Sequence, residues 1–307
     1  KLVMFFIFPF ILGFYLQHES RFLKHENEFK ISLIQPNIHL SFKRDYTKRQ
    51  QNIDSLIYFS KKAKDSDLII WPESAIPSII TSKSINIIKS IQDKMLIDSP
   101  AILSGITFKN SNNYYNSIIF FNKYNLIDTY HKTHLVPFAE HVPLSDSFKF
   151  LNRINIGQAN FSSGVDYKVF NYNGFRFGNM ICIESVFPKI SRKFVLNGAD
   201  YLLVLVNDGW YENQPEPNQH AEQAIFRAIE NRRPLARCAN TGISSVINHR
   251  GQLVYKSKLN TSDIIHANLV GVNFSTFYTK YGDLFSYLCC IILCFLFLRK
   301  IFNFRNV

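Results

Sequence analysis

The sequence lacks the motifs that identify most nucleic-acid-binding and metal-binding domains. It contains no zinc-finger spacing, no helix-turn-helix pattern and no basic helix interleaved with stacking aromatic residues. No Cys-x-x-Cys pair is present, which excludes the common zinc and dithiol redox motifs. Internal repeats and low-complexity linkers are also absent. We therefore expect no nucleic-acid partner, no metal ion and no cofactor.

Acidic residues are scarce relative to basic ones. Lys and Arg number 35 against 23 Asp and Glu, which gives a formal net charge of +12 and a pI near 9.4. Such a charge favours anionic partners, either nucleic acid or a phospholipid surface. The basic residues lie in short patches such as Lys43-Arg44 and Lys61-Lys62, and the missing motifs argue against nucleic acid. With 307 residues, 47% of them hydrophobic, the chain can form one large domain or two small ones.

The two longest apolar runs without charge lie at the ends of the chain, at Leu2–Leu16 and Leu284–Leu298. A helix needs about 20 residues to cross a bilayer. The second run is long enough once its flanking residues Arg299-Lys300 extend toward the interface. We predict a transmembrane segment at 1–17 and a C-terminal transmembrane helix at 284–304.

The first run has two alternative interpretations, a secretory signal peptide and a buried core helix. No small-residue cleavage site follows Leu16, which argues against the signal peptide. Because the chain opens on Lys1 instead of Met, we interpret the run as the end of a membrane domain whose other helices precede it or come from a partner. The short basic tail with Arg299, Lys300 and Arg305 places the C-terminus in the cytoplasm and the middle of the chain on the opposite side.

Cysteine is also infrequent, with five in the chain. Cys289, Cys290 and Cys294 lie in the last apolar run, where they are small apolar side chains of a helix. The remaining two, Cys182 and Cys238, could form one disulfide, but one pair is no disulfide framework. We interpret Cys182 as a free functional thiol and Cys238 as a core residue.

Between the apolar ends, short apolar runs alternate with amphipathic stretches. We expect strands at 30–35, 67–71, 101–104, 115–122, 125–130, 175–183, 201–206, 234–239, 244–247 and 264–270, and helices within 46–64, 84–97, 188–197 and 219–232. This alternation is typical of a layered α/β domain. We place that domain at 30–274, after a linker at 18–29.

Three reactive side chains fall at or beyond the ends of predicted strands. Glu73 follows Trp71-Pro72, Lys132 lies in a loop, and Cys182 closes an apolar strand. Because cysteine attacks as the thiolate, a nearby ammonium favours its ionisation and a carboxylate can accept its proton. Lys132 could also stabilise the oxyanion of a tetrahedral intermediate. The three residues together would form a covalent acyl-enzyme, with Glu73 as general base and later acid.

Simpler interpretations remain open on these residues alone. Glu73 could be a solvated or helix-capping carboxylate, and Lys132 an ordinary loop lysine. Three histidines, His131, His134 and His141, suggest a metal, but their spacing fits no zinc template.

Four segments occur in an order that resembles a known superfamily. They are Trp71-Pro72-Glu73, Lys132 with Leu135-Val136-Pro137-Phe138-Ala139-Glu140-His141-Val142-Pro143, Ile181-Cys182-Ile183-Glu184 and Asn207-Asp208-Gly209-Trp210. From about Ile31 to Asp283 the chain is similar to the carbon-nitrogen hydrolase (nitrilase) superfamily. Within it, the Leu-Val-Pro-Phe stretch and the apolar C-terminus resemble the apolipoprotein N-acyltransferases of bacterial envelopes.

The resemblance implies a nitrilase-like αββα sandwich flanked by transmembrane helices, on the periplasmic side of the bacterial inner membrane. Glu73, Lys132 and Cys182 match the catalytic triad of the family, while Glu140, Glu184 and Trp210 match assisting or substrate-binding positions. It further implies that Cys182 takes an acyl chain from a membrane phospholipid. The thioester then acylates the amine of the diacylglyceryl-cysteine of an apolipoprotein. We expect a monomer.

The sequence departs from the family pattern in a few places. Arg44 stands where the family commonly has tryptophan, Ile183 where it has an aromatic residue, and Ala139 where it has glycine. These differences leave the triad intact and affect the lipid-binding region. Two other functions fit the pattern: a membrane-tethered amidase that acts on small amides, and a membrane-anchored binding module without turnover.

Overall fold

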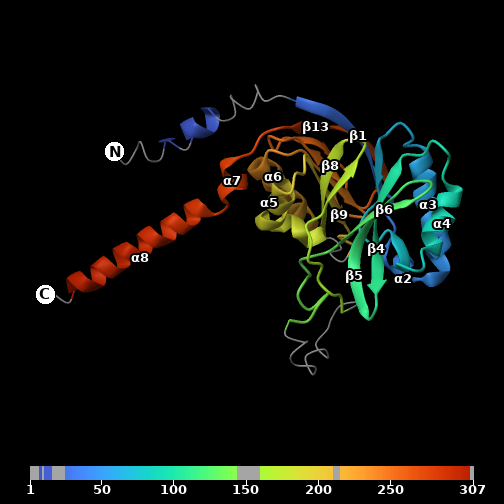
Figure 1. Cartoon of the computed structure of the whole chain (residues 1–307), viewed down its shortest axis with the longest axis horizontal. Helices are drawn as coiled ribbons and strands as arrows, with labels where there is room; N and C mark the ends of the chain where they lie inside the picture. Colours follow the sequence, from blue (N-terminus) through green and yellow to red (C-terminus); the bar gives the residue numbers. More distant parts are fainter. Residues whose placement is uncertain (1–6, 9, 16–24, 144–159, 210–214, 305–307) are drawn as a thin grey trace.

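Two β-sheets pack face to face in the computed structural model, which describes residues 7–8, 10–15, 25–143, 160–209 and 215–304 (Figure 1). The first sheet contains, in spatial order, β13 (Asp263–Val272), β1 (His25–Gln35), β2 (Leu68–Ile70), β4 (Ala101–Asn110), β5 (Asn113–Phe121) and β6 (Leu126–His131), with β3 (Ile76–Thr81) also paired to β4. The second contains β12 (Leu253–Lys256), β11 (Ser245–Ile247), β10 (Leu235–Ala239), β9 (Tyr201–Val206), β8 (Phe175–Ile181) and β7 (Val169–Tyr172).

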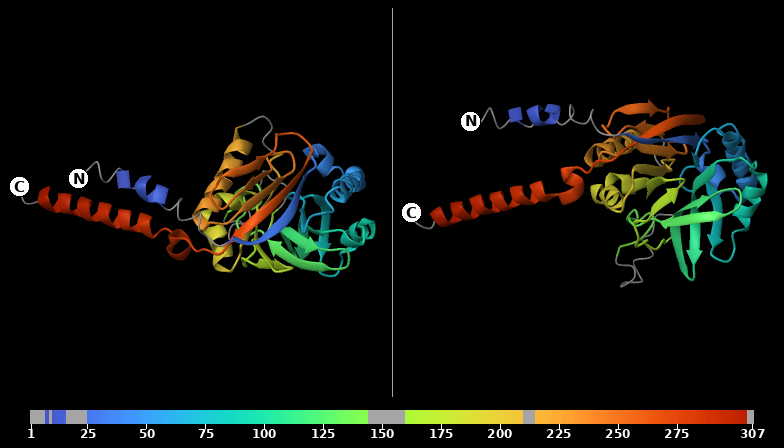
Figure 2. Two further views of the ribbon diagram at one scale, coloured as in Figure 1. Left: turned by 90° about the horizontal axis from the view of Figure 1, so that it is seen from above. Right: turned by 45° about the horizontal axis from the view of Figure 1, so that its top comes forward.

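Helices cover the outer faces of both sheets (Figures 1 and 2). The first sheet is covered by α3 (Arg49–Lys61) and α4 (Asn86–Lys94), and the second by α5 (Pro188–Leu196) and α6 (Glu216–Asn231). The central strands β1, β2 and β4 run parallel, as do β8, β9 and β10. Parallel strands end at a common edge, so residues that follow them are brought together. The expected α/β layers are confirmed.

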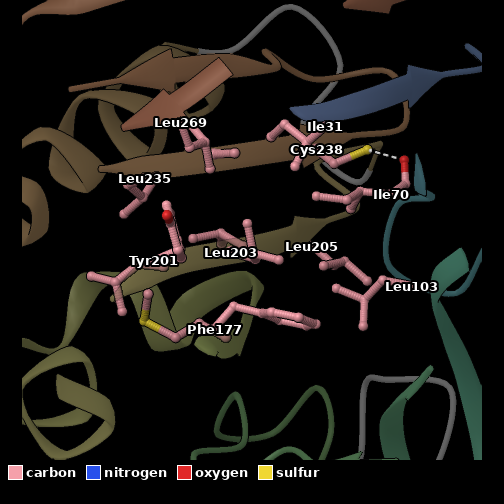
Figure 3. Packing of buried hydrophobic residues seen from close by; sticks show 14 of the residues in the cluster. Ile31, Ile70, Leu103, Phe177, Tyr201, Leu203, Leu205, Leu235, Cys238 and Leu269 are labelled. Carbon is pink, nitrogen blue, oxygen red and sulfur yellow. Dashed lines mark hydrogen bonds between the residues drawn. The ribbon is translucent and has the colours of Figure 1, made fainter. Parts of the chain in front are cut away.

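Alternate residues of the central strands face two different cores. In β5, Ile118 and Phe120 point into the core between the sheets, whereas Ile119 and Phe121 pack against the helix-covered side. Burial on both faces explains why these strands are continuous apolar runs in the sequence. Figure 3 shows the core between the sheets, where side chains from both sheets interdigitate.

The predicted strands and helices agree with the structure to within a few residues at most ends. The hairpin predicted at 115–122 and 125–130 is formed by β5 and β6. Strand β1 begins at His25, so its first five residues fall in the stretch we interpreted as a linker. Short elements were missed: β3, β7, β12, α2 (Leu40–Arg44), α7 (Phe277–Tyr281) and the 3-10 turns η2 (Tyr46–Lys48) and η4 (Cys182–Val186).

The C-terminal helix α8 (Leu284–Phe304) projects away from the domain (Figures 1 and 2). Within the described part of the chain, it is the one helix long and apolar enough to cross a membrane, and none of its span 284–301 is buried. The predicted segment at 1–17 lies largely outside the described residues. A transmembrane role for either end therefore remains a prediction.

The short helix α7 ties α8 to the domain. The Arg192 side chain of α5 donates to the carbonyl oxygens of Tyr278, Thr279 and Lys280 at 2.9–3.1 Å. On the other side, Thr276 Oγ1 donates to the Glu230 carbonyl at 2.6 Å and Thr279 Oγ1 to Asn231 Oδ1 at 3.1 Å. The helix α7, which directly precedes α8 in the chain, is thus hydrogen-bonded to both helices that cover the second sheet.

Candidate active site

The three residues expected to react lie near one another at the ends of strands from both sheets. Glu73 follows β2, Lys132 directly follows β6, and Cys182 directly follows β8. Lys132 Nζ lies 3.8 Å from Glu73 Oε1, and Cys182 is close enough to interact electrostatically with both. Glu73 and Lys132 are buried, while Cys182 is partly exposed. The structure therefore brings the predicted carboxylate, ammonium and thiol together.

A second carboxylate, that of Glu140, completes the surroundings of Lys132. Its Oε2 lies 2.8 Å from Lys132 Nζ, and it accepts a further hydrogen bond from the Val136 N–H. Asn116 Nδ2, from β5, donates to both Glu73 Oε1 and Glu140 Oε1 at 2.8 Å. One buried ammonium and one amide thus hold two carboxylates in a fixed arrangement.

Two residues of this arrangement were missed from the sequence. Asn116 is a polar residue at a buried position of a strand, which is the signal that could have indicated it. Lys43, quoted only as part of a basic patch, donates from Nζ to the Glu73 carbonyl at 3.1 Å. Burial lowers the pKa of Lys43 to about 8, against the opposing effect of Glu73.

Burial and neighbouring charges together set the pKa values of the reactive groups. It raises the pKa of Glu73, more than the nearby Lys132 ammonium lowers it, which makes this carboxylate a better proton acceptor. Burial alone would lower the pKa of Lys132, but the carboxylates of Glu73 and Glu140 outweigh it and keep the ammonium charged. Burial and the Glu73 charge raise the pKa of the Cys182 thiol, while Lys132 lowers it. The resting site therefore holds a neutral thiol beside a charged lysine and a carboxylate of raised basicity.

Cys182 adopts a backbone conformation that is uncommon for a residue with a side chain. Its φ is +50°, at the point where β8 turns into η4. This left-handed conformation costs roughly 1–2 kcal/mol, so the surrounding contacts must hold it. Ser185 Oγ donates to the Cys182 carbonyl at 2.9 Å, which closes the turn.

Glu184 joins the Cys182 turn to the Lys132 loop. It is fully buried, and its Oε2 accepts from the Ile181 N–H at 2.8 Å. Its Oε1 accepts from Tyr130 Oη, Thr133 N, Thr133 Oγ1 and His134 N at 2.7–3.2 Å. Burial raises the pKa of Glu184, although these donors favour the ionised form. One carboxylate therefore fixes the end of β6 relative to the end of β8.

Replacing Glu184 by glutamine is expected to destabilise the protein by about 2–4 kcal/mol. The amide nitrogen of glutamine can only donate, but every hydrogen-bonding partner of this carboxylate is also a donor. At least one buried N–H or O–H group would therefore lose its acceptor. Urea unfolding monitored by circular dichroism measures the change. The exposed Glu222 on α6 provides the control, and Glu222→Gln should stay within about 0.5 kcal/mol of the wild type. Equal stability of the two variants would contradict this role.

The remaining residues singled out in the sequence are Trp210, Cys238 and the histidines near Lys132. Trp210 lies outside the described residues, so its role stays a prediction. Cys238 is buried, as expected of a core residue, and its Sγ lies 3.3 and 3.2 Å from the carbonyl oxygens of Ile34 and Ile70, either of which can accept from the thiol; Figure 3 marks the contact with Ile70. Of the histidines that suggested a metal, His131 forms a hydrogen bond with Ser117 Oγ through Nδ1, and the ring of His134 packs against the ring of Phe187.

A further cluster beside Cys182 was not anticipated. Potential ligand atoms of Cys182, Asp208 and His220 lie within 4.8 Å of one another. The guanidinium of Arg237 occupies the same place, with Nη2 at 2.6 Å from Asp208 Oδ2 and 3.3 Å from His220 Nδ1. A buried guanidinium there repels a second cation, so the group is better suited to hydrogen bonding than to metal binding. The spacing of Asp208 and His220 in the sequence gives no sign of this contact.

The chain was compared with known protein families, curated proteins and solved structures. The carbon-nitrogen hydrolase family model matches residues 30–271. Proteins named apolipoprotein N-acyltransferase are similar to the chain: that of Geobacter metallireducens is 33% identical over 85% of this chain and 51% of its own length, and that of Wigglesworthia glossinidia brevipalpis is 31% identical over 98% and 62%. The chain therefore spans about half to three-fifths of these relatives.

Solved structures of the same fold are more distant in sequence. Nit3 of Saccharomyces cerevisiae, a nitrilase superfamily member, is 20% identical with a TM-score of 0.59, and the match covers 80% of this chain and 91% of that one. An amidase from Nesterenkonia sp. is 16% identical with a TM-score of 0.59, covering 84% and 95%. They establish the fold and not the substrate. The family model covers residues 30–271, which is most of the chain, and the fold of the solved structures agrees with it. The chain therefore belongs to the carbon-nitrogen hydrolase family.

Proposed function

We propose that this protein transfers an acyl chain from a membrane phospholipid to the N-terminal amine of the diacylglyceryl-cysteine of apolipoproteins. The observation that carries the proposal is the convergence of the buried Glu73 and Lys132 with the partly exposed Cys182 at one site. Such a site suits covalent acyl transfer, because it supplies a nucleophile, a base and a fixed positive charge. The similarity to proteins named apolipoprotein N-acyltransferase supports this substrate choice.

In the first step, Cys182 Sγ attacks the carbonyl carbon of a phospholipid acyl ester, and Glu73 accepts the thiol proton. Lys132 Nζ, held by two carboxylates, faces the negative charge that develops on the carbonyl oxygen. The carbon–oxygen ester bond then breaks, and Glu73 returns the proton to the departing alkoxide. The products are a lysophospholipid and an acyl thioester on Cys182.

In the second step, the free α-amine of the lipoprotein cysteine attacks the thioester carbonyl. Glu73 accepts a proton from the amine, the carbon–sulfur bond breaks, and the thiolate regains a proton. A thioester reacts readily with an amine, and exclusion of water limits its hydrolysis. The net reaction forms an amide and regenerates the free thiol.

We further propose a place for the domain at the bacterial inner membrane, on the periplasmic side. The apolar helix α8 and the basic net charge support contact with an anionic bilayer. The basic residues after Leu298 support a cytoplasmic C-terminus, which leaves the domain on the other side. Amide hydrolysis by a tethered amidase is the alternative, and shares the same three residues.

The proposal predicts an acyl adduct on one cysteine. After incubation of the full chain with phospholipid in mixed micelles, mass spectrometry should find one acyl chain on Cys182 and one lysophospholipid released per adduct. Cys182→Ala should abolish both products, whereas Cys290→Ala, at an exposed cysteine on α8, should abolish neither. An unmodified Cys182 in a preparation that acylates lipoprotein would contradict the proposal. Ammonia released from small amides, without lysophospholipid, would favour the amidase.

A further inference from the structure

Lys43, which the mechanism above does not use, reaches the main chain of the proposed general base. It lies on the five-residue helix α2, and its Nζ donates to the carbonyl oxygen of Glu73 at 3.1 Å. The two residues are 30 positions apart in the sequence, so the contact depends on how the fold places α2.

Glu73 lies at the point where the backbone leaves the first sheet. The hydrogen bonds between β2 and β4 continue past the end of β2, from the Trp71 N–H to the Leu103 carbonyl at 2.8 Å and from the Gly105 N–H to the Pro72 carbonyl at 3.2 Å. The residue after Glu73 has a φ of +51°, so the chain turns there. The carbonyl that the lysine ammonium binds is the first one beyond this ladder. The ammonium therefore holds the chain where the sheet no longer does.

Helix α2 is itself held from two sides, which makes it a firm support. Asn52 Nδ2, on α3, donates to the Phe42 carbonyl at 3.2 Å. Just before α2, the Ile38 N–H donates to Asn240 Oδ1 at 3.0 Å, and Asn240 Nδ2 donates back to the Ile38 carbonyl at 2.7 Å. Asn240 directly follows β10. The helix therefore connects the Glu73 backbone, beyond a strand of the first sheet, to the end of a strand in the second.

We propose that Lys43 is a positioning residue for Glu73. Its charge-assisted hydrogen bond holds the Glu73 backbone so that the carboxylate stays beside Lys132 Nζ and close to the Cys182 thiol. This inference rests on the proposed function, in which Glu73 accepts the thiol proton. Glu184 fixes the ends of β6 and β8 relative to each other, and Lys43 fixes the remaining member of the reactive group.

The charge on Lys43 gives this role a pH signature. Lys43 faces Glu73 and the buried thiol of Cys238, and burial lowers its pKa to about 8. The charged or titratable groups that face Glu73 are Lys43, Lys132, Glu140 and Cys182. Below about pH 8 the ammonium strengthens the hydrogen bond to the Glu73 carbonyl and lowers the pKa of the Glu73 carboxyl. Above that pH a neutral Lys43 keeps only the weaker hydrogen bond of an amine.

Three variants separate this hydrogen bond from general packing. Lys43→Met has no donor and no charge, and we expect it to slow acylation of Cys182 at saturating donor by about 10- to 100-fold near neutral pH. The donor concentration that gives half the maximal rate should stay nearly the same. Lys43→Arg keeps a charge and donors and should restore most of the rate. Lys61→Met, at an exposed lysine of α3, is the control and should match the wild type.

The pH profiles provide a readout that a purely structural role would not move. The acid limb of the rate should shift upward in Lys43→Met, because Glu73 must be ionised to act as base and has lost a positive neighbour. The deficit relative to the wild type should shrink as the pH rises through about 8, where wild-type Lys43 loses its charge. Lys43→Arg stays charged and should show no such change. Lys43→Gln, which keeps an uncharged donor, replaces Lys43→Met if that variant does not fold, and should show the same shrinking deficit.

The acyl donor for these measurements is p-nitrophenyl butyrate, an activated ester that tests the reactive residues without a lipid. Mass spectrometry of the full chain after an acid quench measures the butyryl group on Cys182. Wild-type rates in Lys43→Met, a deficit that is equal at every pH, or a deficit that Lys43→Arg does not relieve would each overturn the inference. A wild-type chain that accepts butyrate from this ester but no acyl chain from phospholipid would contradict the proposed function instead, while the ester still decides the role of Lys43. If Cys182 accepts an acyl group from neither donor, both are overturned.

Discussion

Lys132→Met is expected to lower the rate of acyl-enzyme formation by at least about 10²–10³-fold, the usual effect of losing one oxyanion-stabilising group. The same change should destabilise the protein by about 3–5 kcal/mol, since it leaves two carboxylates without their buried cation. Methionine has a similar length and no charge, so packing changes little. Single-turnover acylation measures the first effect, and urea unfolding measures the second.

The chain provides a matched control and a partial rescue. Lys168 pairs with Asp128 at 2.5 Å, but its side chain is 53% exposed, so Lys168→Met should cost no more than about 1 kcal/mol and leave acylation unchanged. Adding Glu140→Gln to Lys132→Met removes one of the unpaired charges and should restore part of the stability without restoring activity. If Lys132→Met and Lys168→Met behaved alike, the buried network would have no special role.

Gly105→Ala is expected to slow the proposed acylation by about 100-fold although residue 105 carries no reactive group. A Cβ on Gly105 would collide with the backbone nitrogen of Ser74 and would lie 2.6 Å from Glu73 Cα. Ser74 already has a φ of +51°, so this backbone has little freedom to yield. A displacement of Glu73 by about 1 Å can cost about 100-fold in rate, and overpacking typically costs about 1–3 kcal/mol. Single-turnover acylation and urea unfolding report the two losses.

Gly174→Ala is the control that distinguishes displacement of Glu73 from backbone strain as the cause of a loss in Gly105→Ala. A Cβ on Gly174, in the turn between β7 and β8, would meet nothing within 4 Å, although its φ is +84°. Gly174→Ala should therefore cost roughly 1–2 kcal/mol for the left-handed backbone and leave acylation intact. Normal acylation by Gly105→Ala would show that Glu73 is not held by this contact, or is not needed.

Much of the fold could be predicted because its central strands are buried on both faces. The run Tyr201–Val206 is apolar throughout and bounded by Asp200 and Asn207, and β9 has the predicted bounds. The exposed edge strand β12 (Leu253–Lys256) was missed because none of its side chains is buried, so no alternation marks it. The apolar pattern of a sequence reflects which side chains are buried. A strand with no buried side chain therefore cannot be recognised from that pattern.

The site could be predicted only where reactive residue types occur in recognisable segments. Glu73, Lys132 and Cys182 were found in this way. Asn116 and His220 were not, because their partners are 43 and 38 residues away and meet them only through the sheet topology. The left-handed backbone of Cys182 was also invisible, since no glycine or asparagine marks it.

The hydrogen bonds of α7 connect α8 mechanically to the turn that carries Cys182. Arg192 connects α7 to α5, and α5 begins two residues after the turn that carries Cys182. If α8 crosses a bilayer as proposed, a change in its tilt would therefore be passed through α7 and α5 to the turn that carries the Cys182 sulfur. The tilt of α8 would then set the height of Cys182 above the lipid headgroups. Under the proposed function, bilayer thickness would then set the depth at which Cys182 meets the ester bond of a phospholipid.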